Sequence, residues 1–465
     1  MSEVAGAGSM FTAACIAGIS MLAAGAGSVE AQAEREALIA SLDSAAYAWA
    51  GQAAVPGVSV AVVHRGDTLL MRGYGYVDLE WEVATPRGAD ASYEIGSITK
   101  QFTAASVMQL VEQGKLDLDA DFTNYIDFDT QGHLVTVRRL LDHTSGIKGY
   151  TEMSAFGELT PRKLPRDTMV RLIESEPFDF EPGTALIYNN SAFFFLGLIV
   201  AEVSGQTYEE YVAENIFEAL GMDDSYYCSE SAIRGRRAHG YDADASGLQR
   251  KRYLDHTWPY AAGSLCSTVG DLVRWNQALH GGEIVSAESY RLMTTPVPLE
   301  DGTPIRYAMG LIVDAPGGRR TISHGGGING FVSDGRYYPD DGLIIVALQN
   351  STGANVGALG SALADIVLGP APQVEPTPYT GDLQEFVGSY TGPSRGRSMT
   401  MTVSIDDGGL VMGSGRGEPF TPDHRDALTW ANGNLLLTFV RKEGRIHELR
   451  VDSGGGHYVL VRAGS

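Results

Sequence analysis

Ser97 and Lys100 are the first residues in the chain whose types and spacing suggest chemistry. Apolar residues recur at steps of three and four over 98–111, which predicts a helix over 97–113. Residues three apart share a helix face, so the Lys100 amine should lie near the Ser97 hydroxyl. A serine becomes nucleophilic when a neighbouring base takes its proton, and burial can lower a lysine pKa enough for that role. The pair therefore predicts a nucleophile with its base.

Spacing alone is a weak signal, because an N-cap serine with a solvated lysine has the same pattern. The chain contains a second S-x-x-K at Ser145 and Lys148, with Gly146 inside it, and we assign this copy to a loop because no helix carries the two residues to one face. A G-x-S-x-G motif surrounds Ser394, but no strand running into a helix is readable there. We predict a hairpin loop at Ser394.

Three other groups of polar residues stand near predicted element ends. Tyr188 and Asn190 lie two apart in an extended segment before an apolar helix over 191–203, so their side chains should point to the same side. His324 precedes three glycines between predicted strands over 319–323 and 331–338. Such glycines either present backbone N–H groups to a ligand or form a flexible turn. His143 precedes a T-S-G turn, and we expect its side chain to hold that turn.

The order of predicted elements indicates an α/β (α+β) protein. Strands near the start of the chain, over 58–63 and 69–73, and strands over 307–348 should complete one antiparallel sheet flanked by helices, with a helical subdomain between them. After a proline-rich linker at 370–382, the segment 383–465 alternates short strands with glycine turns and predicts a small all-β barrel. We expect the main domain to span 34–369.

Composition limits the partners and the compartment. The chain has 465 residues, and 34 basic against 57 acidic side chains give a net charge of −23, which argues against nucleic acid and anionic membranes. The segment 1–33 resembles a signal peptide with an A-x-A cleavage site, although its start has no lysine or arginine. We therefore expect a periplasmic or secreted protein, with a cytoplasmic one as the alternative, and no membrane span beyond that segment.

Cysteine usage is sparse. The chain has only Cys15, Cys228 and Cys266, without metal-site spacing, so no zinc site is predicted. The sequence leaves open whether Cys228 and Cys266 pair and whether the protein is an oligomer.

The motifs in this order resemble the serine β-lactamase and penicillin-recognising superfamily, above all class C β-lactamases, D-alanyl-D-alanine carboxypeptidases, D-aminopeptidases and related esterases. The resemblance covers about 52–368, and the tail from Leu383 resembles a lipocalin-like domain. The matching residues are Ser97-Ile98-Thr99-Lys100, Tyr188-Asn189-Asn190 and His324-Gly325-Gly326.

This resemblance implies an acyl-enzyme mechanism without a metal or cofactor. It implies that Ser97 attacks a carbonyl, that Lys100 and Tyr188 move the proton, and that Asn190, His324, Gly325 and Gly326 bind substrate. It further implies an oxyanion hole made by the backbone N–H groups of Ser97 and Gly327, a contribution of about 2.7–4 kcal/mol per donor.

His324 stands where β-lactamases usually have lysine. An imidazole there should change charge between about pH 5 and 8, and we expect activity to follow that change. This departure favours small peptides, amides or esters as substrates. The alternatives are a β-lactamase or a non-catalytic penicillin-binding or sensor protein.

Overall fold

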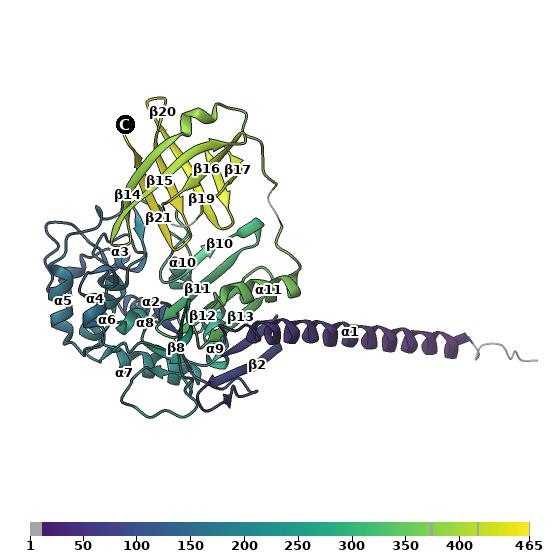
Figure 1. Ribbon diagram of the computed structural model, residues 1–465. Helices are drawn as coiled ribbons and strands as arrows, with labels where there is room; N and C mark the ends of the chain where they lie inside the picture. The colour runs from purple at the N-terminus through teal and green to yellow at the C-terminus, as the bar shows by residue number, and fades with distance from the viewer. Residues whose placement is uncertain (1–11, 373–374, 416–417, 465) are drawn as a thin grey trace, which may run out of the picture.

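The computed structural model describes residues 12–372, 375–415 and 418–464. Its first element is the long helix α1 (Thr12–Ala50), which extends away from the body of the molecule in Figure 1. The predicted signal segment 1–33 lies partly outside the described residues, and its remainder forms the first part of α1. Within the described ranges, no helix has the length and apolar content needed to cross a membrane.

A seven-stranded antiparallel sheet forms the centre of the main domain, in the order β10-β11-β12-β13-β1-β2-β3. Strand β1 pairs with both β2 and β13, so strands from both ends of this domain complete one sheet, as the sequence predicts. The strands are β1 (Gly57–His64), β2 (Asp67–Asp78), β3 (Val83–Ala84), β10 (Ile312–Asp314), β11 (Thr321–Ile328), β12 (Phe331–Tyr338) and β13 (Leu343–Gln349).

Alternation along β1 explains why both faces of this sheet are covered. Val58, Val60 and Val62 pack with residues of α1 and α11 (Gly357–Leu368), whereas Ala61 and Val63 face the larger core on the other side. Successive side chains of a strand point to opposite faces, so a continuous apolar run requires a layer on each side.

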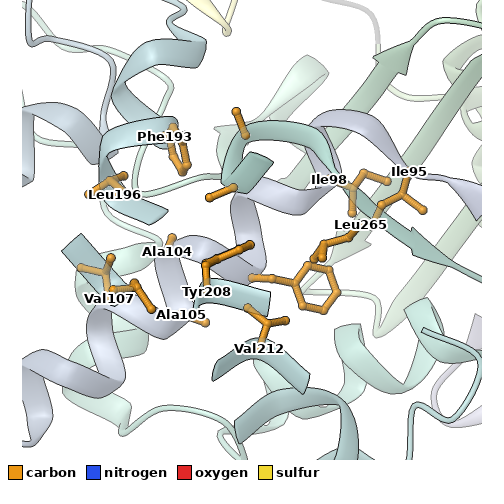
Figure 2. Packing of buried hydrophobic residues seen from close by; sticks show 14 of the residues in the cluster. Ile95, Ile98, Ala104, Ala105, Val107, Phe193, Leu196, Tyr208, Val212 and Leu265 are labelled. Atoms are coloured by element: carbon orange, nitrogen blue, oxygen red, sulfur yellow. The ribbon is translucent and has the colours of Figure 1, made fainter. Parts of the chain in front are cut away.

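The larger core surrounds α2 (Thr99–Glu112), which is buried on all sides over its first ten residues. Figure 2 shows Ala104, Ala105 and Val107 of this helix among side chains from neighbouring helices. Its surroundings are α3 (Val137–Leu141), α5 (Arg166–Glu174), α6 (Asn190–Ser204), α7 (Tyr208–Val212), α8 (Tyr260–Gly263), α9 (Val269–Gly281) and α10 (Ala287–Met293). A buried helix gives the residues at its start a rigid support.

Shorter elements connect this helical part. A small sheet joins β4 (Tyr93–Glu94), β9 (Leu265–Ser267) and β6 (Tyr226–Tyr227), and β7 (Tyr241–Asp244) pairs with β8 (Gly247–Arg250). Cys228 and Cys266 form a disulfide, which answers the question that the sequence left open. The bond ties β9 to the residue that follows β6.

The C-terminal part is an antiparallel sheet that curls into a half-barrel above the main domain (Figure 1). It has an apolar core of its own, centred on residues such as Phe386, Trp430 and Phe439. Its strands are β14 (Gly388–Ser394), β15 (Arg397–Asp406), β16 (Gly409–Gly413), β17 (Asp423–Asp426), β18 (Thr429–Asn432), β19 (Leu435–Lys442), β20 (Arg445–Asp452) and β21 (Gly456–Arg462). The predicted fold class is confirmed.

Candidate active site

Ser97 lies in a 3-10 turn, η1 (Gly96–Ile98), that leads directly into α2. The predicted helix over 97–113 therefore begins as a tighter turn and is α-helical only from Thr99. Gly96 has φ +52°, and a Cβ on it would lie 2.9 Å from the Gly327 nitrogen. The glycine thus permits the turn that carries Ser97 to pack against β11.

Lys100 is fully buried, and its amine has three oxygen partners. It lies 3.2 Å from Ser97 Oγ, 2.8 Å from Asn190 Oδ1 and 2.8 Å from the Ala262 carbonyl oxygen. Burial holds the pKa of Lys100 well below its usual value; Arg395 acts in the same direction and Glu152 opposes it. A neutral amine has two N–H groups and one lone pair, which match two carbonyl acceptors and one hydroxyl donor. This geometry suits a base that accepts the Ser97 proton.

Tyr188 follows β5 (Leu186–Ile187), and Asn190 begins α6. The Lys100 Nζ lies 4.7 Å from the Tyr188 ring centre, and the two residues of the Y-x-N motif face the same amine, as predicted. The Tyr188 hydroxyl is buried close to the Ser97 side chain. Burial raises the pKa of Tyr188, and the nearby Ser97 hydroxyl and Arg395 lower it by less, so the phenol keeps its proton at neutral pH.

Between them, Asn189 caps α6 by accepting a hydrogen bond from the Ala192 amide at 2.9 Å. Its side-chain nitrogen donates to the carbonyl of Ile147. The middle residue of the motif therefore has a structural function that holds its two neighbours in place.

The three glycines after His324 lie inside strand β11, not between two strands as the sequence suggested. Gly326 pairs with Ser333 of β12, and a Cβ on it would lie 2.0 Å from the Ile95 carbonyl oxygen. Ser333 Oγ donates to that same oxygen at 2.8 Å. The glycines are needed for the close approach of β11 to η1, and neighbouring Gly327 remains exposed beside it.

His324 is buried and neutral, so the expected change of its charge between pH 5 and 8 is wrong. Burial is the main cause that lowers the pKa of His324 to about 3; a proton on Lys100 would act in the same direction, and the Gly325 carbonyl opposes it. Nδ1 donates to that carbonyl at 2.5 Å, and Nε2 accepts from the Tyr307 hydroxyl at 3.0 Å. Its role here is to connect β11 to Tyr307.

His143 does not hold the T-S-G turn. The Asp142 carboxylate does so by accepting from the Thr144 amide and hydroxyl at 3.0 and 2.6 Å. The His143 ring packs 4.3 Å from the Tyr188 ring, and Nδ1 accepts from the Asn189 amide at 3.2 Å. His143 therefore supports the Y-x-N segment.

Neither of the two competing serines is among the three oxygen partners of Lys100. Lys148 pairs with Asp179 at 2.7 Å, and no hydrogen bond joins it to Ser145 in the described structure. Ser394 ends β14 at a hairpin, as the sequence predicts.

Among the described residues, Glu94, Glu230 and His256 have oxygen and nitrogen atoms within 4.8 Å of one another, a spacing that could hold a metal. Arg237 pairs with both carboxylates, at 2.9 and 2.7 Å, and Lys251 also pairs with Glu94. We interpret the group as an ion-pair network, because cations already occupy the carboxylates.

A serine and a buried lysine at the start of a core helix, with a tyrosine above them and a glycine strand alongside, define a serine hydrolase of the S-x-x-K type. The chain belongs to the Beta-lactamase family, whose model matches residues 30–367. This result confirms the resemblance seen in the sequence.

Individual relatives extend the match beyond the family domain. A D-aminopeptidase of Brucella anthropi is 27% identical over 400 residues, covering 85% of this chain and 74% of the relative. The structure of an octameric penicillin-binding protein homologue from Pyrococcus abyssi matches with a TM-score of 0.64 and 26% identity, over 90% of this chain and 99% of that one. A D-stereospecific amidohydrolase from Streptomyces matches with a TM-score of 0.61 and 26% identity, over 71% of this chain and 99% of that one.

Proposed function

We propose that this protein hydrolyses small peptides or amides through an acyl-enzyme on Ser97. The observation that carries the proposal is the buried Lys100 amine, which has Ser97 Oγ as one of its three partners. The D-aminopeptidase and amidohydrolase relatives support amide substrates. Esters of the same acyl groups require the same attack with an easier leaving group, so they should also react.

In the proposed mechanism, Lys100 accepts the proton of Ser97 as Oγ attacks the carbonyl carbon. The backbone N–H groups of Ser97 and Gly327 stabilise the oxyanion, and Asn190 holds a polar group of the substrate. His324 and Gly326 act through strand β11, because both ring nitrogens of His324 are already hydrogen-bonded and Gly326 allows β11 to approach η1. Collapse breaks the C–N bond, and the leaving amine takes the Tyr188 proton, which Lys100 then replaces. Water then attacks the carbonyl carbon of the acyl-enzyme with the same proton transfers, which releases the acid and restores Ser97.

Neutral His324 supports peptides and amides over β-lactams, because it places no fixed cation beside Tyr188. We expect poor turnover of penicillins and cephalosporins. Efficient cephalosporin hydrolysis by the wild-type protein would favour the β-lactamase alternative.

Labelling with a fluorophosphonate, followed by intact-mass and peptide mass spectrometry, tests the nucleophile. We expect one label per chain, on Ser97, and none on the Ser97→Ala variant, whose activity should fall by several orders of magnitude with the fold intact. Label on Ser145 or Ser394 would contradict the assignment. A stable acyl-enzyme that no water releases would instead favour the non-catalytic sensor.

We also propose that the protein is exported. The predicted signal segment 1–33 and the disulfide of Cys228 with Cys266 both fit an oxidising compartment. Cell fractionation followed by N-terminal sequencing of the mature chain should find a start near residue 34 outside the cytoplasm.

A further inference from the structure

The tip of the hairpin between β14 and β15 reaches the candidate active site from the C-terminal half-barrel. The Arg395 guanidinium carbon lies 5.5 Å from the Tyr188 ring centre. Its Nη2 lies 2.6 Å from Glu152 Oε1 and 3.4 Å from Thr151 Oγ1. Thr151 in turn accepts from Asn190 Nδ2 at 3.4 Å. Thr151 therefore links Arg395 to Asn190, which contacts the Lys100 amine.

Backbone packing holds this hairpin in place. Gly396 has φ +63°, and a Cβ there would lie 2.3 Å from the Cβ of Glu152, so the tip touches Glu152 closely enough to require glycine. On the same side, Gly456 of β21 pairs with Ile187, the residue before Tyr188. The half-barrel is thus attached directly to the segment that carries the catalytic tyrosine.

Glu152 is the acidic group that this hairpin covers. Its side chain is 13% exposed, while that of Arg395 is 41% exposed. The two charges act in opposite directions on the nearby Lys100 amine: Arg395 lowers its pKa and Glu152 raises it. Without Arg395, the largely buried Glu152 carboxylate would attract a substrate ammonium; with Arg395 present, the carboxylate is already paired.

The hydrogen bonds that Arg395 makes to other described residues both use Nη2. A guanidinium has five N–H donors in a planar fork, so Nε and Nη1 retain donors for another acceptor. A substrate carboxylate or carbonyl beside the acyl group can satisfy them.

We propose that Arg395 determines substrate specificity by occupying Glu152. The site then rejects acyl groups that carry a free ammonium next to the scissile carbonyl, and accepts acyl groups that are uncharged there or carry a carboxylate. This inference rests on the proposed amide hydrolysis, and it distinguishes this chain from an enzyme that requires a free amino terminus.

The test compares racemic alanine p-nitroanilide with its N-acetyl and N-succinyl derivatives, which share one leaving group. Wild-type protein should prefer the two acylated substrates. In Arg395→Ala, the kcat/KM ratio of free amine to N-acetyl substrate should rise at least about tenfold, since one nearby cation is lost. Exposed Arg397, two residues along the same hairpin, provides the matched control, and Arg397→Ala should leave the ratio unchanged.

The double variant Arg395→Ala with Glu152→Gln should not show the raised kcat/KM ratio, because the unpaired Glu152 carboxylate is what attracts the free amine. An unchanged ratio in Arg395→Ala, or an equal rise in Arg397→Ala, overturns the proposal.

Binding to the Ser97→Ala variant gives a readout that does not need turnover. Calorimetry should show N-acetylalanine amide binding more tightly than alanine amide, with the order reversed when Arg395→Ala is added. If Ser97 is not labelled but the amides still bind in this order, the proposed hydrolysis is refuted and the proposed specificity is not. Equal binding of both amides in both proteins would refute the specificity.

Discussion

At the scale of single residues, the candidate site gathers three bases that stay neutral: Lys100, His143 and His324. Burial is the first cause of each lowered pKa, and a proton on Lys100 would lower the pKa of both histidines further. None of these three bases is a cation in the resting site. Lys100 becomes positively charged when it takes the serine proton, at the moment when negative charge develops on the carbonyl oxygen. This arrangement stabilises the transition state more than the ground state.

Lys100→Met tests the base. Activity should fall by several orders of magnitude, because the Lys100 amine, 3.2 Å from Ser97 Oγ, is the base proposed to take the serine proton. The pKa of Lys100 in the folded protein lies well below its value of about 10.4 in the unfolded chain. Between these two pKa values the unfolded chain binds more protons than the folded protein, so the free energy of unfolding rises with pH. Urea unfolding should show that this rise, at most about 1.4 kcal/mol per pH unit, is lost in the variant.

Lys148→Met, in the second S-x-x-K, is the matched control for activity. Its amine pairs with Asp179 and not with a serine, so the folded variant should keep wild-type kcat. Equal losses in the two variants would contradict the assignment of Lys100.

His324→Gln tests the neutral imidazole. With a folded pKa of about 3 and an unfolded value near 6.5, His324 contributes stability that is present above about pH 6.5 and lost as pH falls toward 3. The variant should therefore show a shallower loss of unfolding free energy on acidification. Its kcat/KM profile between pH 5 and 8 should keep the wild-type shape at a lower level, because the bridge to Tyr307 is weakened. A limb of the profile that vanishes would show that His324 titrates there.

At the scale of elements, the approach of β11 to η1 sets the distance between Ser97 and Gly327, the second of the two proposed oxyanion donors. Ser333 and Gly326 both contact the Ile95 carbonyl region just before the turn. Strand pairing with β12 fixes β11 from the other side.

Gly326→Ala should disturb this approach. Its Cβ would lie 2.0 Å from the Ile95 carbonyl oxygen, so strand and turn must separate, at a cost of about 1–3 kcal/mol in stability and a large loss of kcat. Gly325→Ala is the control, since its nearest atom lies at 3.4 Å. Thermal unfolding and kcat should both distinguish the two variants; similar behaviour would mean that β11 does not position the oxyanion hole.

Local pattern predicted much of this site. Helical spacing linked Ser97 with Lys100, and alternation in an extended segment linked Tyr188 with Asn190. The same reasoning placed the glycines of β11 between two strands and left open whether they present backbone N–H groups to a ligand or form a turn, because close backbone approach and a turn require the same residue. Arg395 could not be found this way, because it reaches the site through a sheet that follows the main domain in sequence, and no periodicity records that contact.

At the scale of the molecule, the half-barrel has its own core yet is joined to the main domain through β5 and β21. Ion pairs add to this junction: Arg306 with Asp452 at 3.0 Å and Arg450 with Asp301 at 2.6 Å. A separate core favours independent folding of 34–369 and 383–465, whereas the shared strand pairing predicts that separation affects Tyr188.

A chain that ends at Gly369 tests both points. The separate apolar cores predict that this chain stays soluble and folded, and limited proteolysis of the intact protein should cut first within 370–382. Without β21, the segment of Leu186 and Ile187 loses its strand partner, so kcat should fall through misplacement of Tyr188. Without Arg395, the shorter chain should also share the altered substrate preference of Arg395→Ala in the intact protein. Insoluble protein would make the half-barrel part of the main core, and full activity with unchanged preference would show that the half-barrel does not act on the site.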